Sequence, residues 1–305
     1  MRFGGRRTSG NVESQRGQSF GGGGFGGGRG GGLGGLVFGL VLNRFGIGGL
    51  LVLFAVTMLL GDPIGLLGGG GGGQQTAVAP HQARQAGRPA GDVCAEDEVT
   101  RFSCQVLAST EDRWSEVFQA AGQRYEPPRL VFYDGRGMSG CGAAQAAMGP
   151  FYCPSDRRIY LDTTFFRELE RRHGAPGDFA QAYVIAHEVG HHIQTITGIA
   201  RDVRQAQARA SQAEANALQV RMELQADCYA GVWAALERGA MEPGDLEEGL
   251  RAAEAIGDDT LQRAAGRRVV PESFTHGTSA QRREWLRRGF DAANPDACDT
   301  FSARI

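Results

Sequence analysis

The sequence predicts an α+β fold, in which a helix-dominated domain with a small antiparallel sheet follows a single transmembrane helix. Three observations predict it. The 48 glycines of the 305-residue chain concentrate before residue 75, and only the part from about residue 92 onward has the composition of a globular domain. A long apolar run without charges precedes that part. After residue 201, nearly every segment has the apolar spacing of a helix.

The first 91 residues divide into three predicted segments. Residues 1–44 are expected to form a disordered tail, because they are rich in glycine and arginine and mostly too polar to offset the entropy of ordering. Residues 45–61, with the sequence FGIGGLLVLFAVTMLLG, carry no charge and predict a transmembrane helix near the short limit for a bilayer. A cleaved signal peptide, the alternative, would have a shorter apolar region nearer to the start of the chain. Residues 62–91 predict a flexible linker, and residues 92–305 the domain.

The charges on the two sides of the apolar run predict its orientation. Before the run, Glu13 is the single acidic residue, while Asp62 follows the run. The arginines before the run are Arg2, Arg6, Arg7, Arg16, Arg29 and Arg44. By the positive-inside rule, the N-terminus is cytoplasmic and the domain is periplasmic or extracellular, on a single-pass protein of the inner cell membrane. The net charge of -2 gives no electrostatic case for a nucleic-acid partner.

The use of cysteine agrees with export. All six cysteines follow the apolar run, at Cys94, Cys104, Cys141, Cys153, Cys228 and Cys298. An even number confined to the outer side favours disulfides, with buried free thiols as the alternative. A bridge between Cys141 and Cys153 is expected, because the segment between them can fold back as a pair of strands.

Within the domain, each element has its own signal. Residues 112–122 have helical periodicity, residues 128–135 form a predicted strand rich in Val, Phe and Tyr, and residues 149–162 a hairpin with its turn near Ser155 and Asp156. A helix over 163–174 should stop at Gly174. The helix over 177–198 has Asp178 as its expected cap and Gly198 at its end. The segments 208–239, 243–259 and 279–290 then predict further helices.

The helix over 177–198 carries His187, Glu188 and His191 in an otherwise apolar run. Residues four apart on a helix lie on one face about 5 to 6 Å apart, so both histidines can point at one place. Two facing imidazoles suit Zn2+, and Glu188 lies beside that place, where a base must be to take a proton from water. Three such groups are costly in a buried apolar helix without partners. This HExxH arrangement predicts one zinc ion per chain.

Zinc catalysis requires a third protein ligand and an open fourth position. The segment RMELQADCYAG offers Glu223 and Asp227, again four apart on a helix. Glu223 is the predicted metal ligand. Asp227 is then expected to accept the outer N–H of a zinc-binding histidine and to fix its tautomer. Surface acids on a charged helix are the alternative, but the residues around them are largely apolar; Glu214 is the other carboxylate that could close the site.

Catalysis also needs a donor for the tetrahedral oxyanion. His276 is a candidate because it precedes a predicted helix cap at Ser279, although a lone loop histidine is more often structural; Tyr229 is a weaker candidate. His192 points about 100° away from His191 around the helix, which predicts a place behind the ligands or in the core. The strand over 157–162 could hold an extended peptide if it lies at a sheet edge.

A series of segments covers nearly the whole chain: MRFGGRRTSGNVESQRG, the glycine-rich run with one span, GPFYCPSDRRIYLD, AHEVGHHIQ, ELQADCYAGVWA and FTHGTSAQRREWLRRG. Together, and in the same order, these segments resemble a known family, the bacterial putative neutral zinc metallopeptidases. The resemblance implies a membrane-anchored zincin with the HExxH plus Glu and Asp pattern of gluzincins. It implies no particular substrate.

The residues and the resemblance favour hydrolysis of a peptide bond in a peptide or protein substrate, with Glu188 as the general base. Membrane contact would be through the single span. Two other classes of function are compatible with the sequence. One is a zinc-stabilised, catalytically silent envelope module that binds a partner protein, and the other is a structural envelope protein whose HExxH is accidental.

Overall fold

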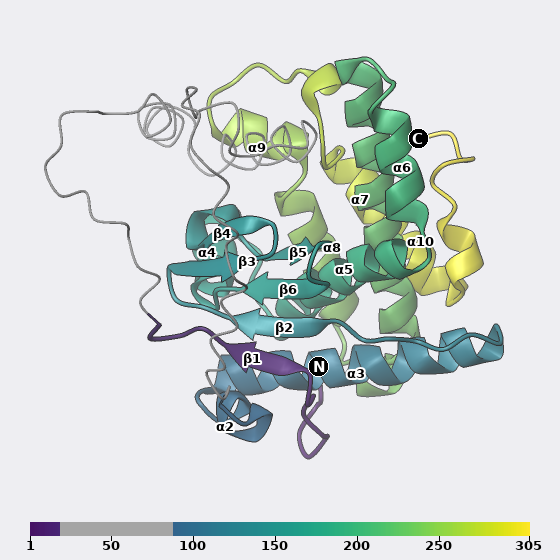
Figure 1. The fold of residues 1–305 in the computed structure, drawn as a ribbon. Helices are drawn as coiled ribbons and strands as arrows, with labels where there is room; N and C mark the ends of the chain where they lie inside the picture. The colour runs from purple at the N-terminus through teal and green to yellow at the C-terminus, as the bar shows by residue number, and fades with distance from the viewer. Residues whose placement is uncertain (19–87) are drawn as a thin grey trace, which may run out of the picture.

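This computed structural model describes residues 1–18 and 88–305 (Figure 1). The predicted span over residues 45–61, the rest of the predicted tail and most of the predicted linker lie outside the described residues. No helix in the described part is both long and apolar enough to cross a membrane.

The described residues form a helix-dominated α+β fold, as the sequence predicts. The strands are β1 (Val12–Ser14), β2 (Arg129–Phe132), β3 (Arg136–Ser139), β4 (Gly142–Gln145), β5 (Phe151–Cys153) and β6 (Arg158–Leu161). The helices are α2 (Ala90–Cys94), α3 (Glu98–Ala120), α4 (Thr164–His173), α5 (Asp178–Ile196), α6 (Ile199–Gln207), α7 (Gln212–Leu236), α8 (Asp245–Ala255), α9 (Asp258–Ala264) and α10 (Ser279–Ala292).

The main sheet has the strand order β1-β2-β6-β5 and is mixed. The pairs β1–β2 and β2–β6 are parallel, and only β5 runs antiparallel to its neighbour, β6. The prediction of an antiparallel sheet is therefore wrong for the pairs β1–β2 and β2–β6, and it holds for the pair β5–β6 and for the separate hairpin of β3 and β4. The sequence showed the β5–β6 hairpin, but the parallel pairs join segments that are distant along the chain, which a local pattern does not reveal.

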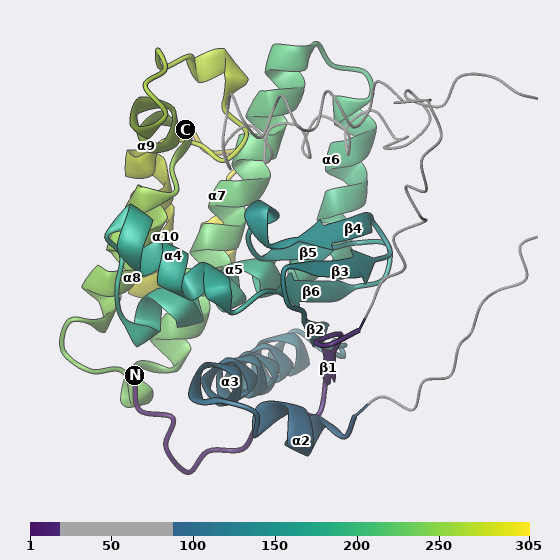
Figure 2. The ribbon, with the colours of Figure 1, turned by 90° about the vertical axis from the view of Figure 1, so that its left-hand side faces the viewer.

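The two faces of the sheet contact different groups of residues. Leu130 and Phe132 of β2 belong to the main core with the helices, whereas Val131 of β2 and Tyr160 of β6 belong to a smaller core with the β3–β4 hairpin. This alternation follows from the two-residue period of a strand. In the helical part, α5 contacts α3, α7 and α8, and α7 contacts α10 (Figure 2). Most residues of α5 and α7 are buried, and these two helices contact each other.

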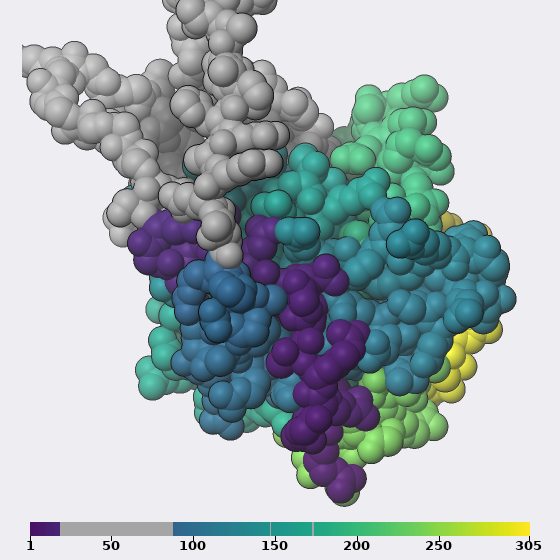
Figure 3. Space-filling view, turned by 60° about the horizontal axis from the view of Figure 1, so that its bottom comes forward, coloured from purple at the N-terminus to yellow at the C-terminus, as the bar shows by residue number. Residues whose placement is uncertain are grey.

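The start of the chain corrects the predicted disorder of residues 1–44, as far as it is described. Residues 1–18 cross the surface beside α2 and α3 and contribute β1 to the sheet (Figure 3). Phe3 and Val12 are buried in the main core. Composition missed this segment because its order comes from pairing with distant residues and not from its own propensity.

The helix boundaries differ from the predictions in two informative places. Helix α3 begins at Glu98, well before the predicted start at residue 112, because the Asp97 carboxylate accepts the amide N–H of Thr100 and caps the helix. Helix α5 is preceded by Gly177 at a φ of 115°, and Asp178 is its first helical residue instead of its cap. The Asp178 carboxylate pairs with the amino group of Met1 at 2.7 Å.

All the cysteines form disulfides, as the sequence favours: Cys94–Cys104, Cys141–Cys153 and Cys228–Cys298. The expected Cys141–Cys153 bridge is present, but the two residues do not lie in one pair of strands. Cys141 lies in the turn between β3 and β4, and Cys153 ends β5. This disulfide therefore ties the hairpin to the main sheet.

Candidate metal centre

Helices α5 and α7 approach closely at the HExxH segment. A Cβ added at Gly190 would lie only 2.9 Å from the Cα of Ala226, so a glycine is required for this crossing. His187 and His191 lie on the same face of α5, with ring centroids 4.8 Å apart. The close crossing brings Glu223 of α7 opposite this pair.

Three side chains converge there, as the sequence predicts. The Glu223 carboxylate lies 3.2 Å from Nε2 of His187 and 3.6 Å from Nε2 of His191. One ligand atom from each of these residues lies within 4.8 Å of the others. Among the described residues, the one other acidic group of this kind consists of Asp178, Asp245 and Glu248, and its first two members already pair with the Met1 amino group.

The hydrogen bonds behind the two histidines test whether these donors suit a metal. Nδ1 of His187 lies 2.8 Å from an Asp227 oxygen, and Nδ1 of His191 lies 2.9 Å from the Gln194 side-chain oxygen. An acceptor at Nδ1 fixes the N–H there and leaves the Nε2 lone pair for a metal. Two imidazole nitrogens and a carboxylate oxygen form a common ligand set of catalytic zinc. The residues fit zinc, and Asp227 has the predicted supporting position.

Asp227 is fully buried and belongs to a network that the sequence analysis missed. Arg282 of α10 donates two hydrogen bonds to its carboxylate, at 2.8 and 2.9 Å, and Tyr183 of α5 donates a third at 2.6 Å. Burial alone would raise the pKa of Asp227, but the charges and hydrogen bonds of Arg282 and His187 together outweigh burial and lower the pKa to about 2. The carboxylate behind His187 is therefore ionised at neutral pH. A helical-period segment with several arginines gives no sign of which one points inward.

The candidate ligands shift one another's pKa values. Burial opposes a charge on His191, but the neighbouring Glu223 carboxylate outweighs this and raises the pKa of His191 to about 9. Burial would raise the pKa of Glu223, but the two histidines hold it well below its usual value. In the absence of metal, the cluster therefore holds a proton on His191 and a negative charge on Glu223.

Glu188 lies beside the ligands and outside their group. It is buried, and burial raises the pKa of its carboxyl against the lowering effect of His191 and His187. The backbone amide of Tyr152, on the edge strand β5, donates a hydrogen bond to this carboxylate and lowers its pKa. Glu188 thus lies between the candidate metal ligands and a sheet edge.

His276 approaches the same centre from the loop before α10. Its Nδ1 lies 3.1 Å from the Asp258 carboxylate, and its charge interacts with those of Glu223 and Arg282. Burial would lower the pKa of His276, but Asp258 outweighs burial and raises it. Asp258, the first residue of α9, also accepts the backbone amides of residues 275–277, which fixes the loop. Sequence reasoning missed Asp258 because its contacts are made across the fold.

The remaining candidates lie elsewhere. Nδ1 of His192 lies 3.1 Å from the Tyr152 hydroxyl, and burial lowers the pKa of His192 to about 4, so that it is neutral and part of the core. The Tyr229 ring packs edge-on against Trp114, with centroids 5.6 Å apart. Glu214 is exposed and forms a capping box at the start of α7. Glu214 therefore does not close the site.

Comparisons with known proteins identify the family of this chain. The family model described as "Putative neutral zinc metallopeptidase" matches residues 1–301. The chain is 48% identical over 315 residues to the uncharacterized protein YpfJ of Escherichia coli strain K12, with all of both chains covered. It is 39% identical over 261 residues to the uncharacterized protein Rv2575 of Mycobacterium tuberculosis, covering 81% of this chain and 85% of the relative. No solved structure matches. The chain thus belongs to the family described as putative neutral zinc metallopeptidases.

Proposed function

We propose that the protein is a membrane-anchored, zinc-dependent peptidase in which His187, His191 and Glu223 hold one zinc ion. The observation that carries the proposal is the convergence of these three side chains next to Glu188. Both imidazoles are oriented by an acceptor at Nδ1. A module that only binds zinc needs the ligands, but it has no need of a buried carboxylate beside them.

Zinc bound at this centre would lower the pKa of a water toward about 7 and polarise the carbonyl of the scissile peptide bond. Glu188 takes the proton from the attacking water and passes it to the leaving amine. The raised pKa of Glu188 suits this task, because a general base works best with a pKa near the working pH. His276, whose protonated form is favoured by Asp258, is the proposed donor to the oxyanion.

The sheet edge beside Glu188 is the proposed binding place for an extended substrate. The strand that the sequence analysis proposed for this role, β6, lies between β2 and β5 and has no free edge. The edge strand on that side is β5. An extended peptide could add to it by main-chain hydrogen bonds and pass Glu188.

The working place of the domain is proposed to be outside the cytoplasm. Three disulfides are typical of an oxidising compartment, and they occur throughout the described domain. The apolar run over residues 45–61 is the proposed membrane attachment.

The substitution Glu188→Gln tests the function, because it keeps the size of the side chain and removes the base. The full-length protein should retain zinc, while its hydrolysis of a mixed peptide library, followed by mass spectrometry, falls by at least roughly a hundredfold. The exposed Glu214→Gln is the matched control and should leave hydrolysis unchanged. Equal hydrolysis by the Glu188 variant and the wild type would refute the role of Glu188. A wild type that holds zinc but cleaves nothing would instead support the silent binding module.

A further inference from the structure

The first residues of the chain are an integral strand of the sheet. Residues 12–14 pair in parallel register with residues 130–132 of β2. The amide of Leu130 donates to the carbonyl of Asn11 at 2.9 Å, and the amide of Gln15 donates to the carbonyl of Phe132 at 2.7 Å. Without β1, the edge of β2 would expose unpaired backbone groups.

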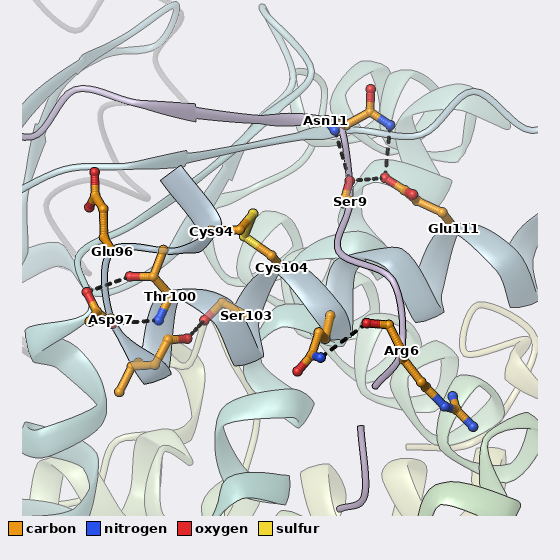
Figure 4. The surroundings of a disulfide bond; sticks show 12 residues. Arg6, Ser9, Asn11, Cys94, Glu96, Asp97, Thr100, Ser103, Cys104 and Glu111 are labelled. Carbon is orange, nitrogen blue, oxygen red and sulfur yellow. Dashed lines mark hydrogen bonds between the residues drawn. A yellow bond between two sulfur atoms is a disulfide. The ribbon is translucent and has the colours of Figure 1, made fainter. Parts of the chain in front are cut away.

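The residues before β1 are held against α3. Phe3 is 2% exposed and packs edge-on against Phe102, with ring centroids 5.8 Å apart. The amide of Ser9 donates to the carbonyl of Cys104 at 3.0 Å, directly beside the Cys94–Cys104 disulfide (Figure 4). The N-terminal segment thus contacts a disulfide-bonded part of the domain.

One buried carboxylate of the domain depends on this segment. The Glu111 side chain, on α3, is 9% exposed. It pairs with Arg7 at 3.0 Å. It also accepts hydrogen bonds from the Asn11 amide at 2.9 Å and from the Ser9 hydroxyl (Figure 4), so all three partners come from residues 1–18. A buried carboxylate that loses its partners is destabilising. The domain is therefore built to have residues 1–18 docked.

The arginines of this segment form ion pairs with the domain, which is a structural role in addition to the membrane orientation predicted from their charge. Arg6 pairs with the buried Glu237 at 2.6 Å, and Arg16 pairs with Glu96 at 2.7 Å. Together with Arg7, they complement acidic side chains of the domain. Their positive charge is thus accounted for by docking, and it need not mark a cytoplasmic tail.

We propose that residues 1–18 and residues 88–305 lie on the same side of the membrane, in the compartment where the disulfides form. The contacts above cannot form across a bilayer, whether the segment docks on its own chain or on a second copy. The proposal replaces the predicted arrangement of a cytoplasmic N-terminus and an external domain. It is incompatible with a single membrane crossing between the two parts, and it does not depend on peptidase activity.

Labelling of single introduced cysteines tests the proposal in spheroplasts that express the full chain. Gly10→Cys reports on the N-terminal segment and Gly239→Cys on the domain; both glycines are exposed, and a Cβ there meets nothing within 4 Å. A membrane-impermeant maleimide should label both to the same extent before and after lysis. A cytoplasmic protein thiol that is labelled only after lysis proves that the membrane is intact.

Each result of this experiment decides the question. Labelling of one introduced cysteine before lysis and of the other only after lysis would overturn the proposal. Labelling of both cysteines only after lysis would agree with both segments lying on the same side of the membrane, but it would overturn their placement in the compartment where the disulfides form. Docking is checked independently by hydrogen exchange of the purified full chain, in which amides of residues 9–15 should exchange at least roughly a hundredfold more slowly than in an unstructured peptide. Unprotected exchange there would contradict the docked segment.

Discussion

At the scale of single residues, the candidate centre has two layers of contacts. The inner layer, His187, His191 and Glu223, is contained in two short motifs, and helical spacing was enough to predict it. The outer layer includes Arg282 and Gln194, which no motif predicted. Arg282, on α10, reaches Asp227 behind His187, and Gln194, one turn along α5, reaches His191, so their roles appear only when the helices have formed and packed.

The proton on His191 gives a prediction for the metal-free protein. Its pKa in the folded state is about 9, above the ordinary value of 6.5, because Glu223 outweighs burial. This group therefore stabilises the fold fully below pH 6.5. The contribution, on the order of 3 kcal/mol, is lost as the pH rises through about 9. Glu223 and Asp227 have lowered pKa values and stay ionised over this range.

Thermal unfolding in a chelator between pH 6.5 and 9.5 measures this effect. The melting temperature of the metal-free wild type should fall over that range relative to His191→Gln, which lacks the titrating group. The zinc-loaded wild type should not show the relative fall, because a ligand imidazole holds no proton at Nε2. A melting temperature that rises relative to the variant would contradict the assigned proton.

At the scale of elements, the strongest predictions were the long apolar helices. The predicted helix over 177–198 and the structural α5 nearly coincide, and so do the predicted 208–239 and α7, since their apolar periodicity is long. The weakest point was β1, a strand of three residues in a polar segment. Its stability comes from pairing with β2 and from ion pairs of Glu13 with Arg129 and Arg158, and a local pattern shows neither.

The docking of the N-terminal segment predicts the effect of removing one of its charges. Arg7→Gln leaves the buried Glu111 carboxylate with neutral partners only, and the free energy of unfolding should fall by about 1 kcal/mol, since Arg7 itself is half-exposed. Arg304→Gln, at an exposed arginine, is the matched control and should change little. Denaturant unfolding of both variants measures the difference. Equal stability of the two would show that the ion pair contributes nothing.

At the scale of the whole molecule, the centre lies where several parts of the chain meet. Helix α5 supplies two candidate ligands and the proposed base, and α7 supplies the third candidate ligand. Helix α10 supplies Arg282, which pairs with Asp227 behind His187, and the loop before α10 supplies His276. The Cys228–Cys298 disulfide ties α7, next to Asp227, to the end of the chain. Sequence reasoning found the candidate ligands, but the contacts that hold them in place join residues far apart in the sequence.

The most direct test of the account is a zinc titration of the purified full-length protein and three variants, each in competition with a chelator. Glu223→Gln removes the proposed third ligand and should cause the largest loss of affinity. Asp227→Asn only weakens the orientation of His187 and should cost on the order of 10- to 100-fold. Glu214→Gln, on the same helix and exposed, should bind zinc like the wild type. Retention of zinc by Glu223→Gln, with loss in Asp227→Asn or Glu214→Gln, would contradict the proposed ligand set.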